Sequence, residues 1–471
     1  MLKSRRKLLV LLMVAAFVMA FTLQAFAAAK VGFSQDDIRK ELKKKYDYDY
    51  KPYIKGTKKL GFDPDKQLFQ RIYYTISLKF VRPITNKDLI DGVFKEVGKL
   101  LKQANVSTTA LSEISHEGNP MDAIVKVYGT KISPNIIRFA CIRGMMEALD
   151  DPHSILMLPD DYSKMKESMS GGNFSGIGVF IMSDPDNFNW LTVSEPIEGT
   201  PAYDAGLQPG DIIIAVDGKT TKDEPIDLTV SRIRGPEGTK VKLTVKRKGV
   251  AKPFTVAIVR RFIHVSSVKA DMLKDKIGYI KLRVYGESTG DEMGKALAEL
   301  QAKGAKAIIL DVRNNSGGLI DAAQDVCSKF LTSNTPIVSV VNRADSKRVM
   351  RSTGGSFTNI PMVLMVNELS ASASEITAGA LKDNNRATLI GARTFGKGSV
   401  QELTPIYGNS GQPAALKLTI ALFYTPKGTK IDGQGLNPDI AVPQDVRDAN
   451  IKTPAKDKQL QKAIQFLKTK I

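Results

Sequence analysis

The sequence predicts an α/β protein in which a layered core carries an inserted β-rich domain and follows a helical N-terminal region. Helical periodicity dominates the first third of the chain. Short β-branched segments broken by glycine and proline occupy residues 171–263. Strands then alternate with helices, which is the pattern of a layered core. The length of 471 residues, with 42% hydrophobic and 25% charged positions, allows two to four domains and excludes disordered, collagen-like and small disulfide-rich proteins.

The first residues resemble an export signal. Four basic residues between Lys3 and Lys7 precede the apolar run Leu8–Phe21, and Ala25-Phe26-Ala27 has the small-x-small pattern of a cleavage site. We therefore expect residues 1–27 to be a signal peptide and the protein to be extracytoplasmic: secreted, periplasmic or in the cell envelope. The apolar run is shorter than the roughly 20 residues of a spanning helix, although extending it to Ala29 nearly reaches that length. An uncleaved membrane anchor is the alternative.

Positive charge is spread along the whole chain. Its 68 Lys and Arg residues against 49 Asp and Glu residues give a formal charge of +19, and no single tail carries the surplus. Signal cleavage would remove four basic and no acidic residues, leaving +15. Such a basic surface favours association with an anionic membrane or cell-wall surface. We expect no nucleic-acid partner, because no recognition motif accompanies the charge.

Cysteine and histidine are scarce. Cys141 and Cys327 each lie in an apolar segment, which favours two buried thiols over a disulfide. Two cysteines and three histidines make a structural zinc site improbable, and we expect neither a metal nor a cofactor.

The N-terminal region, residues 28–170, is expected to be mostly helical. A basic helix opens at Ser34, and helical periodicity continues over Asn86–Ala104 and Pro134–Leu149. The polar, Gly- and Pro-punctuated stretch Asn105–Lys131 predicts a loop or small insertion.

The β-rich block and the core follow. In the block, strands are expected at Asp211–Asp217 and Lys240–Arg247. The core, residues 264–445, begins with a strand at Ile277–Val284, a helix at Asp291–Ala302 and a strand at Ala307–Val312. Residues 446–471 predict a basic helix that docks through one apolar face. That face comprises Leu460, Ile464, Leu467 and Ile471.

Candidate chemistry centres on Pro361–Asn384, where an apolar strand turns at Asn367 into a helix of small residues. A hydroxyl at such a turn lies beside the unpaired N–H groups of a helix N-terminus, which can stabilise an oxyanion.

A serine nucleophile needs a base, usually histidine. None of the three histidines is near a serine motif. The alternative base is a lysine, which must be buried to stay neutral. The histidines are His116, His153 and His264.

Lys397 suits that role, because it follows a predicted strand at Ala387–Gly391 and lies between Gly396 and Gly398. Gln401, four residues later, could orient its amine. From the residues alone, a solvent-exposed turn lysine remains the alternative. The spacing Gly391 to Lys397 also matches a phosphate-binding loop, but glycine follows the lysine where that loop needs Ser or Thr for magnesium.

Asp311–Leu319, with the sequence DVRNNSGGL, follows a strand and supplies paired glycines whose N–H groups could form a second oxyanion donor. Taken alone, it also matches an ordinary turn. S-x-x-K motifs at Ser163 and Ser266 lack the S-D-N and K-T-G motifs that would give them meaning.

Together these segments resemble the carboxyl-terminal processing peptidases, tail-specific serine proteases with a Ser-Lys dyad. The resemblance spans about residues 147–457 and rests on four segments: MEALDDPHS, SASASEITAGALKDNNRA, GARTFGKGSVQ and ALFYTPKGTKIDGQGLNPDI. It implies a ClpP/crotonase-like core with Ser372 as nucleophile, Lys397 as base and Gln401 as the residue that orients it. The implied oxyanion hole is formed by the amides of Gly318 and Ala373. Family members more often have proline where this chain has a serine, in R-N-N-S-G-G.

The resemblance also implies that the β-rich block is a PDZ domain, which binds a free carboxyl terminus by adding it as a strand. AGLQPGDII, beginning at Ala205, is the strongest match. The implied peptide-binding residues are those of the carboxylate-binding loop and of the helix Leu228–Arg234. They are Gly176, Ile177, Gly178, Val179, Val230 and Ile233. Ordinary core packing is the alternative role of the two helix residues.

The sequence therefore predicts an extracytoplasmic serine endopeptidase that recognises the carboxyl termini of protein substrates through its PDZ domain and cleaves through an acyl-enzyme. A non-catalytic PDZ adaptor or chaperone for exported proteins is the alternative function. Whether the chain forms a homodimer stays open, because the helical region matches the family poorly between residues 105 and 131.

Overall fold

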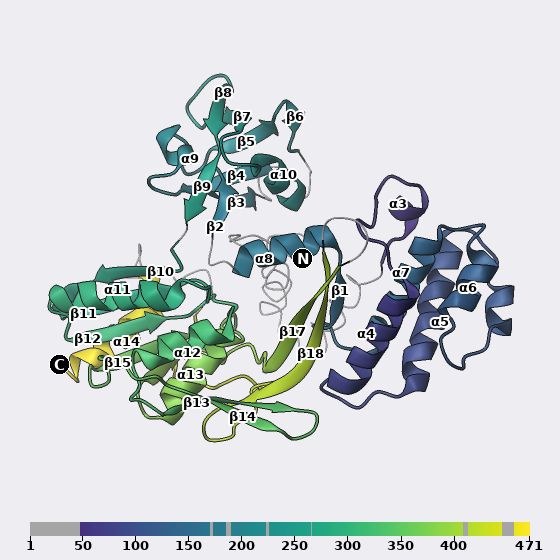
Figure 1. Cartoon of the computed structure of the whole chain (residues 1–471). Coiled ribbons are helices and arrows are strands. Elements are labelled where there is room, and N and C mark those ends of the chain that lie inside the picture. The colour runs from purple at the N-terminus through teal and green to yellow at the C-terminus, as the bar shows by residue number, and fades with distance from the viewer. Residues whose placement is uncertain are drawn as a thin grey trace, which may run out of the picture.

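The computed structural model describes residues 48–169, 173–184, 190–222, 226–264, 266–407, 413–444 and 456–471. The expected signal peptide and the helix expected from Ser34 lie outside these residues. Figure 1 shows a helical region at one side and an α/β core at the other, joined by the long strands β17 (Ser399–Ile406) and β18 (Ala414–Tyr424). A separate β-rich domain lies above the core in this view. The predicted α/β class is confirmed.

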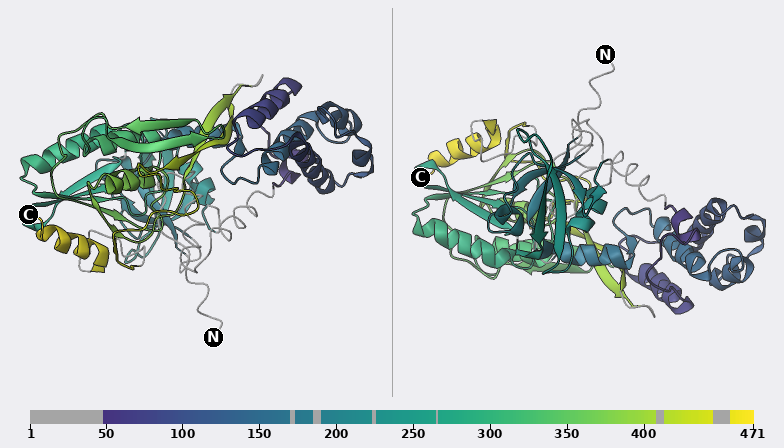
Figure 2. Two further views of the ribbon diagram at one scale, coloured as in Figure 1. Left: turned by 90° about the horizontal axis from the view of Figure 1, so that it is seen from below. Right: turned by 90° about the horizontal axis from the view of Figure 1, so that it is seen from above.

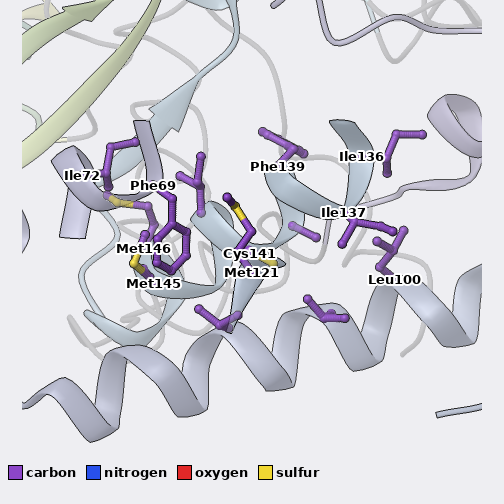
Figure 3. Close-up of a cluster of buried hydrophobic side chains, with 14 of the residues drawn as sticks. Phe69, Ile72, Leu100, Met121, Ile136, Ile137, Phe139, Cys141, Met145 and Met146 are labelled. Carbon is purple, nitrogen blue, oxygen red and sulfur yellow. The ribbon is translucent and has the colours of Figure 1, made fainter. Parts of the chain in front are cut away.

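The N-terminal region packs around two crossing helices, α5 (Asn86–Gln103) and α7 (Pro134–Ala148). The α5 helix begins where Thr85 and Asp88 exchange hydrogen bonds between side chain and backbone, each 3.1 Å long. Gly92 and Gly144 allow the crossing, because a Cβ on Gly92 would lie 2.4 Å from the carbonyl oxygen of Gly144. Figure 3 shows apolar side chains from several helices meeting at this core. The other helices are α3 (Lys51–Ile54), α4 (Lys66–Lys79), η1 (Thr109–Glu113) and α6 (Met121–Tyr128).

For Asn105–Lys131 the expectation was a loop or small insertion, and the loop is wrong, because this stretch contains η1 and α6. Met121 and Ile124 of α6 are fully buried in the helical core. The 8-residue helix lies among glycines and a proline that are also typical of loops. Burial of its apolar face stabilises a helix too short to be stable alone.

The inserted domain contains a six-stranded antiparallel sheet, with five strands in the order β3-β4-β5-β7-β8 and β6 paired to β5. A separate ribbon of β2 (Asn173–Gly176) and β9 (Arg261–His264) carries the chain in and out. The strands are β3 (Val179–Asp184), β4 (Trp190–Pro196), β5 (Ile212–Val216), β6 (Lys219–Thr220), β7 (Lys240–Lys246) and β8 (Phe254–Val259), and the helices are α9 (Pro201–Asp204) and α10 (Ile226–Ile233).

The core contains a six-stranded sheet in the order β10-β11-β12-β15-β16-β19, parallel except where β10 meets β11. Helices α11 (Thr289–Ala302), α12 (Ile320–Ser328) and α13 (Ala373–Asp383) cover one face, and α14 (Lys458–Lys468) covers the other. Figure 2 shows this layering. The strands are β10 (Val268–Met272), β11 (Ile277–Leu282), β12 (Ala307–Asp311), β15 (Met362–Val366), β16 (Thr388–Gly391) and β19 (Ile440–Ala441).

A second sheet borders the first. Strand β18 lies between β13 (Pro336–Asn342) and β1 (Ile155–Met157), with β14 (Lys347–Arg351) beyond β13 and with β17 also paired to β18. Helix α8 (Pro159–Met169) follows β1. Among the described residues, every helix is too short or too polar to span a membrane.

The C-terminal helix docks as expected through Leu460 and Leu467, which are fully buried. Ile471 does not belong to this face, because α14 ends at Lys468 and Ile471 is 44% exposed. Ala463 is buried on the face together with the two leucines.

Candidate active site

The candidate site lies where β12, β15 and β16, three neighbouring parallel strands, reach their carboxyl ends. The loops that follow them carry three of the sequence-predicted segments: residues 312–319, 367–372 and 392–398. Loops at the carboxyl ends of parallel strands meet at one edge of the sheet, which is where α/β proteins commonly place their sites.

Ser372 immediately precedes α13 and has an unusual backbone, with φ 55° and ψ −116°. A non-glycine residue in this conformation is strained, and strain of this kind is common at functional sites. Its neighbours hold it in place. The Ser370 hydroxyl donates to the Val312 carbonyl at 2.9 Å, and the Ser374 hydroxyl donates to the Asn315 carbonyl at 2.9 Å. The loop that ends at Ser372 is therefore fixed to the loop after β12.

The proposed oxyanion donors lie beside Ser372. Within the described part of the chain, the N–H groups of Gly318 and Ala373 make no hydrogen bond. Gly317 must lie close to the serine, because a Cβ there would be 2.8 Å from the Ser372 Cβ and 2.9 Å from the Ala373 nitrogen. The backbone of Tyr285 fixes the loop that contains Gly317 and Gly318, here called the glycine loop. Its carbonyl accepts from the Leu319 N–H at 2.7 Å, and its N–H donates to the Gly317 carbonyl at 3.1 Å.

Glu375 joins the serine segment to the lysine segment. Its fully buried carboxylate accepts from the backbone N–H groups of Ser372 at 2.9 Å and Lys397 at 2.8 Å, both through Oε2. Its other oxygen accepts from Thr394 Oγ1 at 2.5 Å and from the Gly396 N–H at 2.7 Å. Burial raises the pKa of Glu375 to about 7, although these four hydrogen bonds oppose the rise.

Sequence reasoning missed Glu375, because a glutamate three residues into a helix is also a common helix-start residue. The glutamate that ends S-A-S-A-S-E was nevertheless visible in the motif. Its tertiary partners 19 to 22 residues later were not.

Lys397 is half-buried in the loop between β16 and β17. Burial lowers its pKa, while the negative charges of Glu375 and Asp151 act in the opposite direction. Because the Ser372 and Lys397 nitrogens lie 2.9 and 2.8 Å from one oxygen, they are at most 5.7 Å apart, the sum of the two distances. No hydrogen bond links the Ser372 hydroxyl to the Lys397 amine among the described residues.

Gln401 lies on β17 with its amide nitrogen donating to Ser399 Oγ at 2.9 Å and to Thr419 Oγ1 at 3.2 Å. These bonds fix the amide plane. Neither bond is to the Lys397 amine, so the expected orienting role of Gln401 stays a proposal.

A buried charge cluster supports the loop after β12. Arg313, with no exposed surface, binds Asp311 and Asp457 through paired hydrogen bonds of 2.7 to 3.0 Å. The Lys281 amine donates to the Arg313 carbonyl at 2.5 Å and to Asp311 at 3.2 Å. Asp457 also caps α14 by accepting from the Leu460 N–H at 2.9 Å. The C-terminal helix is thereby connected to the glycine loop.

The predicted groove residues of the inserted domain differ in exposure. Ile177 and Ile233 are 1% and 4% exposed in the domain core, whereas Val179 and Val230 are partly buried at its edge. Only glycine fits at position 178, because a Cβ there would lie 2.4 Å from the Thr200 side chain. Gly176 ends β2, immediately before this loop.

The remaining candidates lie in other environments. His116 belongs to the helical region, where it stacks on Phe94 and approaches Asp91 at 3.3 Å. Both cysteines are buried and free, as expected. The Ser266 hydroxyl donates to Glu292 at 2.7 Å.

The chain is similar to proteins of one family. The model for peptidase family S41 matches residues 276–442, and a PDZ-domain model matches residues 192–247. The chain is 37% identical over 334 residues to the carboxyl-terminal-processing protease of Synechocystis sp., which covers 70% of this chain and 76% of the relative. The carboxy-terminal-processing protease of Bartonella bacilliformis is 37% identical over 365 residues, with 75% and 82% covered. The carboxy-terminal processing protease CtpA of Bacillus subtilis is 34% identical over 334 residues, with 71% and 70% covered.

Proposed function

Because this chain belongs to the carboxyl-terminal processing proteases of peptidase family S41 and contains a PDZ domain, we propose that it cleaves peptide bonds with Ser372 as nucleophile and Lys397 as base. The family consists of serine peptidases, and hydrolysis of peptide bonds is therefore its chemistry. The assignment of each step to a residue is our proposal.

In the first step, the neutral amine of Lys397 accepts the Ser372 hydroxyl proton as the oxygen attacks the scissile carbonyl carbon. Burial supports this role, because it lowers the pKa of Lys397 and so favours the neutral form that can accept a proton. The side chains must approach more closely than they do in the free protein. Catalytic hydrogen bonds are often long or poorly aligned before substrate binds.

The carbonyl oxygen becomes negatively charged and accepts hydrogen bonds from the N–H groups of Gly318 and Ala373. These groups have no other partner in the described chain, so they need not break a bond to serve it. Ala373 is the first residue of α13, whose dipole adds to the stabilisation.

The tetrahedral intermediate then collapses. The C–N bond breaks, the Lys397 ammonium gives its proton to the leaving amine, and an ester on Ser372 remains. Water attacks the ester carbon, passes a proton to Lys397, and releases the acid as the serine oxygen regains its proton. The Gln401 side chain would orient the amine through its oxygen, since its amide nitrogen is engaged by Ser399 and Thr419.

The PDZ domain would supply substrate selection by binding the free carboxyl terminus of a protein in the loop Gly176–Val179. Partly buried Val230 would favour an apolar tail. We further propose that the reaction takes place outside the cytoplasm, on the basis of the signal-like sequence at residues 1–27.

The bridge made by Glu375 between the backbones of Ser372 and Lys397 carries this proposal. The test is to incubate the purified protein with a peptide ester that has an apolar tail and to measure the protein mass. An adduct of the acyl group is expected on the wild type and none on Ser372→Ala. An adduct at another residue, or equal peptide cleavage by the Ser372→Ala protein, contradicts the proposal. Tail binding without any turnover by the wild type would favour the adaptor function.

A further inference from the structure

Two buried hydroxyls hold the amide of Gln401, the residue that orients the base in the proposed function. The Gln401 amide nitrogen donates to Ser399 Oγ at 2.9 Å and to Thr419 Oγ1 at 3.2 Å. Ser399 is 5% exposed and Thr419 is 2% exposed, so both side chains are shielded from water. Buried hydroxyls need hydrogen-bond partners, and the one amide group supplies a partner to each.

A β-bulge brings Gln401 and Thr419 together. Val400 of β17 pairs with Ala421 of β18, whereas Gln401, the next residue, pairs with Thr419, so that Ile420 has no partner on β17. Without this shift Gln401 would lie opposite Ile420, whose side chain has no polar atom. Bulges are common next to active sites, where they change the direction of a side chain. The strand register therefore places the amide against a hydroxyl.

The two hydroxyls reach the amide from different directions. Ser399 and Gln401 are two residues apart on β17, so their side chains project from the same face, which Thr419 shares as the residue opposite Gln401. An amide nitrogen has two hydrogens, and each is used by one hydroxyl. Within the described part of the chain, the Gln401 side-chain oxygen makes no hydrogen bond, so it is left to accept from the Lys397 amine.

The backbone of Thr419 is itself held by two segments outside the β17–β18 pair. Its carbonyl accepts from the Val81 N–H at 2.9 Å, and its N–H donates to Ser154 Oγ at 3.0 Å. Val81 follows α4 in the helical region, and Ser154 lies in the turn before β1. These bonds fix the position from which the Thr419 hydroxyl meets Gln401.

Strand β18 also fixes the loop that carries the proposed base. The Phe423 N–H donates to the carbonyl of Gly398, the residue after Lys397, at 2.7 Å. Figure 1 shows β17 and β18 side by side, as their pairing requires. One strand thus holds both the Lys397 loop, through Phe423, and the Gln401 amide, through Thr419.

We propose that Thr419 and Ser399 are positioning residues: their hydroxyls hold the Gln401 amide nitrogen and so keep its oxygen available to the Lys397 amine. This inference rests on the proposed function, in which Gln401 orients Lys397. The two hydroxyls act only through Gln401. If one of them is lost, the amide can rotate, and it then spends part of its time in orientations that do not orient the base.

The test is steady-state kinetics of the purified full chain with an apolar-tailed peptide. Thr419→Val keeps a β-branched side chain and removes the hydroxyl. It should lower kcat about tenfold, as expected for one lost hydrogen bond, with KM little changed. Thr419→Ser keeps the hydroxyl and should recover most of the lost kcat. The matched control is Thr388→Val on β16, a partly buried threonine whose hydroxyl makes no hydrogen bond to the described residues.

A double-mutant comparison shows whether the effect passes through the amide. In a Gln401→Ala background, Thr419→Val should lower kcat no further, because the hydroxyl has no amide left to hold. An equal further loss in that background overturns the inference. Wild-type kcat in folded Thr419→Val, when Gln401→Ala is impaired, also overturns it. Ser399→Ala removes the other hydroxyl and gives the same comparison if Thr419→Val does not fold.

Lys397→Ala, measured in the same assay, separates the inference from the proposed function. If Lys397→Ala is active, the proposed function fails. If Lys397→Ala is inactive while Gln401→Ala has a wild-type kcat, the serine and lysine assignment stands and the inference fails, because it acts through Gln401.

Discussion

The backbone N–H groups of Ser372 and Lys397 donate to the same carboxylate oxygen, at 2.9 and 2.8 Å. The shared acceptor, Oε2 of Glu375, fixes the separation of the two segments independently of their side chains. Two residues 25 positions apart in the chain are therefore held in one geometry by a third that does not itself react.

Glu375→Gln should lower turnover. An amide has one oxygen where the carboxylate has two, and its NH₂ group would face the backbone N–H donors that the carboxylate accepts from. We expect kcat to fall by about 10²-fold, as for a small misplacement of catalytic groups. KM for the peptide should change little. Steady-state kinetics would check this, and an unchanged kcat in a folded variant would contradict it.

The same substitution should change how stability depends on pH. Burial raises the pKa of Glu375 to about 7 from an ordinary 4.5. The stabilisation from its protonated form is fully present below about pH 4.5 and is lost as the pH rises through about 7. Glutamine does not titrate, so Glu375→Gln does not lose stability in this way. The unfolding free energy of the variant minus that of the wild type should therefore increase between pH 4.5 and pH 8. Urea unfolding at both pH values measures the difference, and a constant difference would argue against the raised pKa.

Activity should rise with pH as Lys397 loses its proton. Its pKa is lowered by burial, so the rise should begin below the range of an ordinary exposed lysine. A profile that is flat between about pH 6 and pH 9 would be inconsistent with lysine as base.

Loss of either proposed dyad side chain, in Ser372→Ala or Lys397→Ala, should reduce kcat by about 10⁴- to 10⁶-fold.

Gly317→Ala should impair catalysis more than folding. The added Cβ would lie 2.7 Å from the Ala371 carbonyl oxygen, and φ at this position is 103°. The glycine loop would move away from the serine, and loss of one oxyanion donor costs about 10²- to 10³-fold in kcat. Gly294→Ala in α11 is the control, because the nearest atom to its Cβ is the flexible Lys329 side-chain end at 3.8 Å. Equal losses in both variants would exclude a specific effect.

Asp457→Asn should destabilise the core. It leaves the buried Arg313 guanidinium with less negative charge around it, and breaking a buried pair costs about 3 to 5 kcal/mol. Lys468→Met, which removes an exposed ion pair with Asp275, should cost less than about 1 kcal/mol. Thermal unfolding compares the two. Similar small losses would mean that the Arg313 cluster contributes little to stability.

Much of the candidate site could be proposed from the sequence, because its parts are local. Ser372 follows a strand and precedes a helix of small residues, and Lys397 lies between two glycines. The paired glycines 317 and 318 were recognisable for the same reason. Spacing along the chain sufficed for these residues because each occupies a turn at the end of a strand.

The residues that connect these parts could not be predicted in the same way. Asp457 meets Arg313 across 144 residues, and Gln401 meets Thr419 only through the pairing of β17 with β18. Such contacts depend on strand order and register, which periodicity does not determine. Helix α6 was missed for a related reason, since burial in the tertiary core stabilises it.

The antiparallel ribbon of β2 and β9 brings the two ends of the inserted domain together, with Asn173 opposite His264 and Gly176 opposite Arg261. Another domain whose two ends lie close together could be inserted at this ribbon without changing the length or the path of the surrounding core. Tail preference and bond cleavage could then diversify separately in evolution, and an engineer could exchange one while keeping the other.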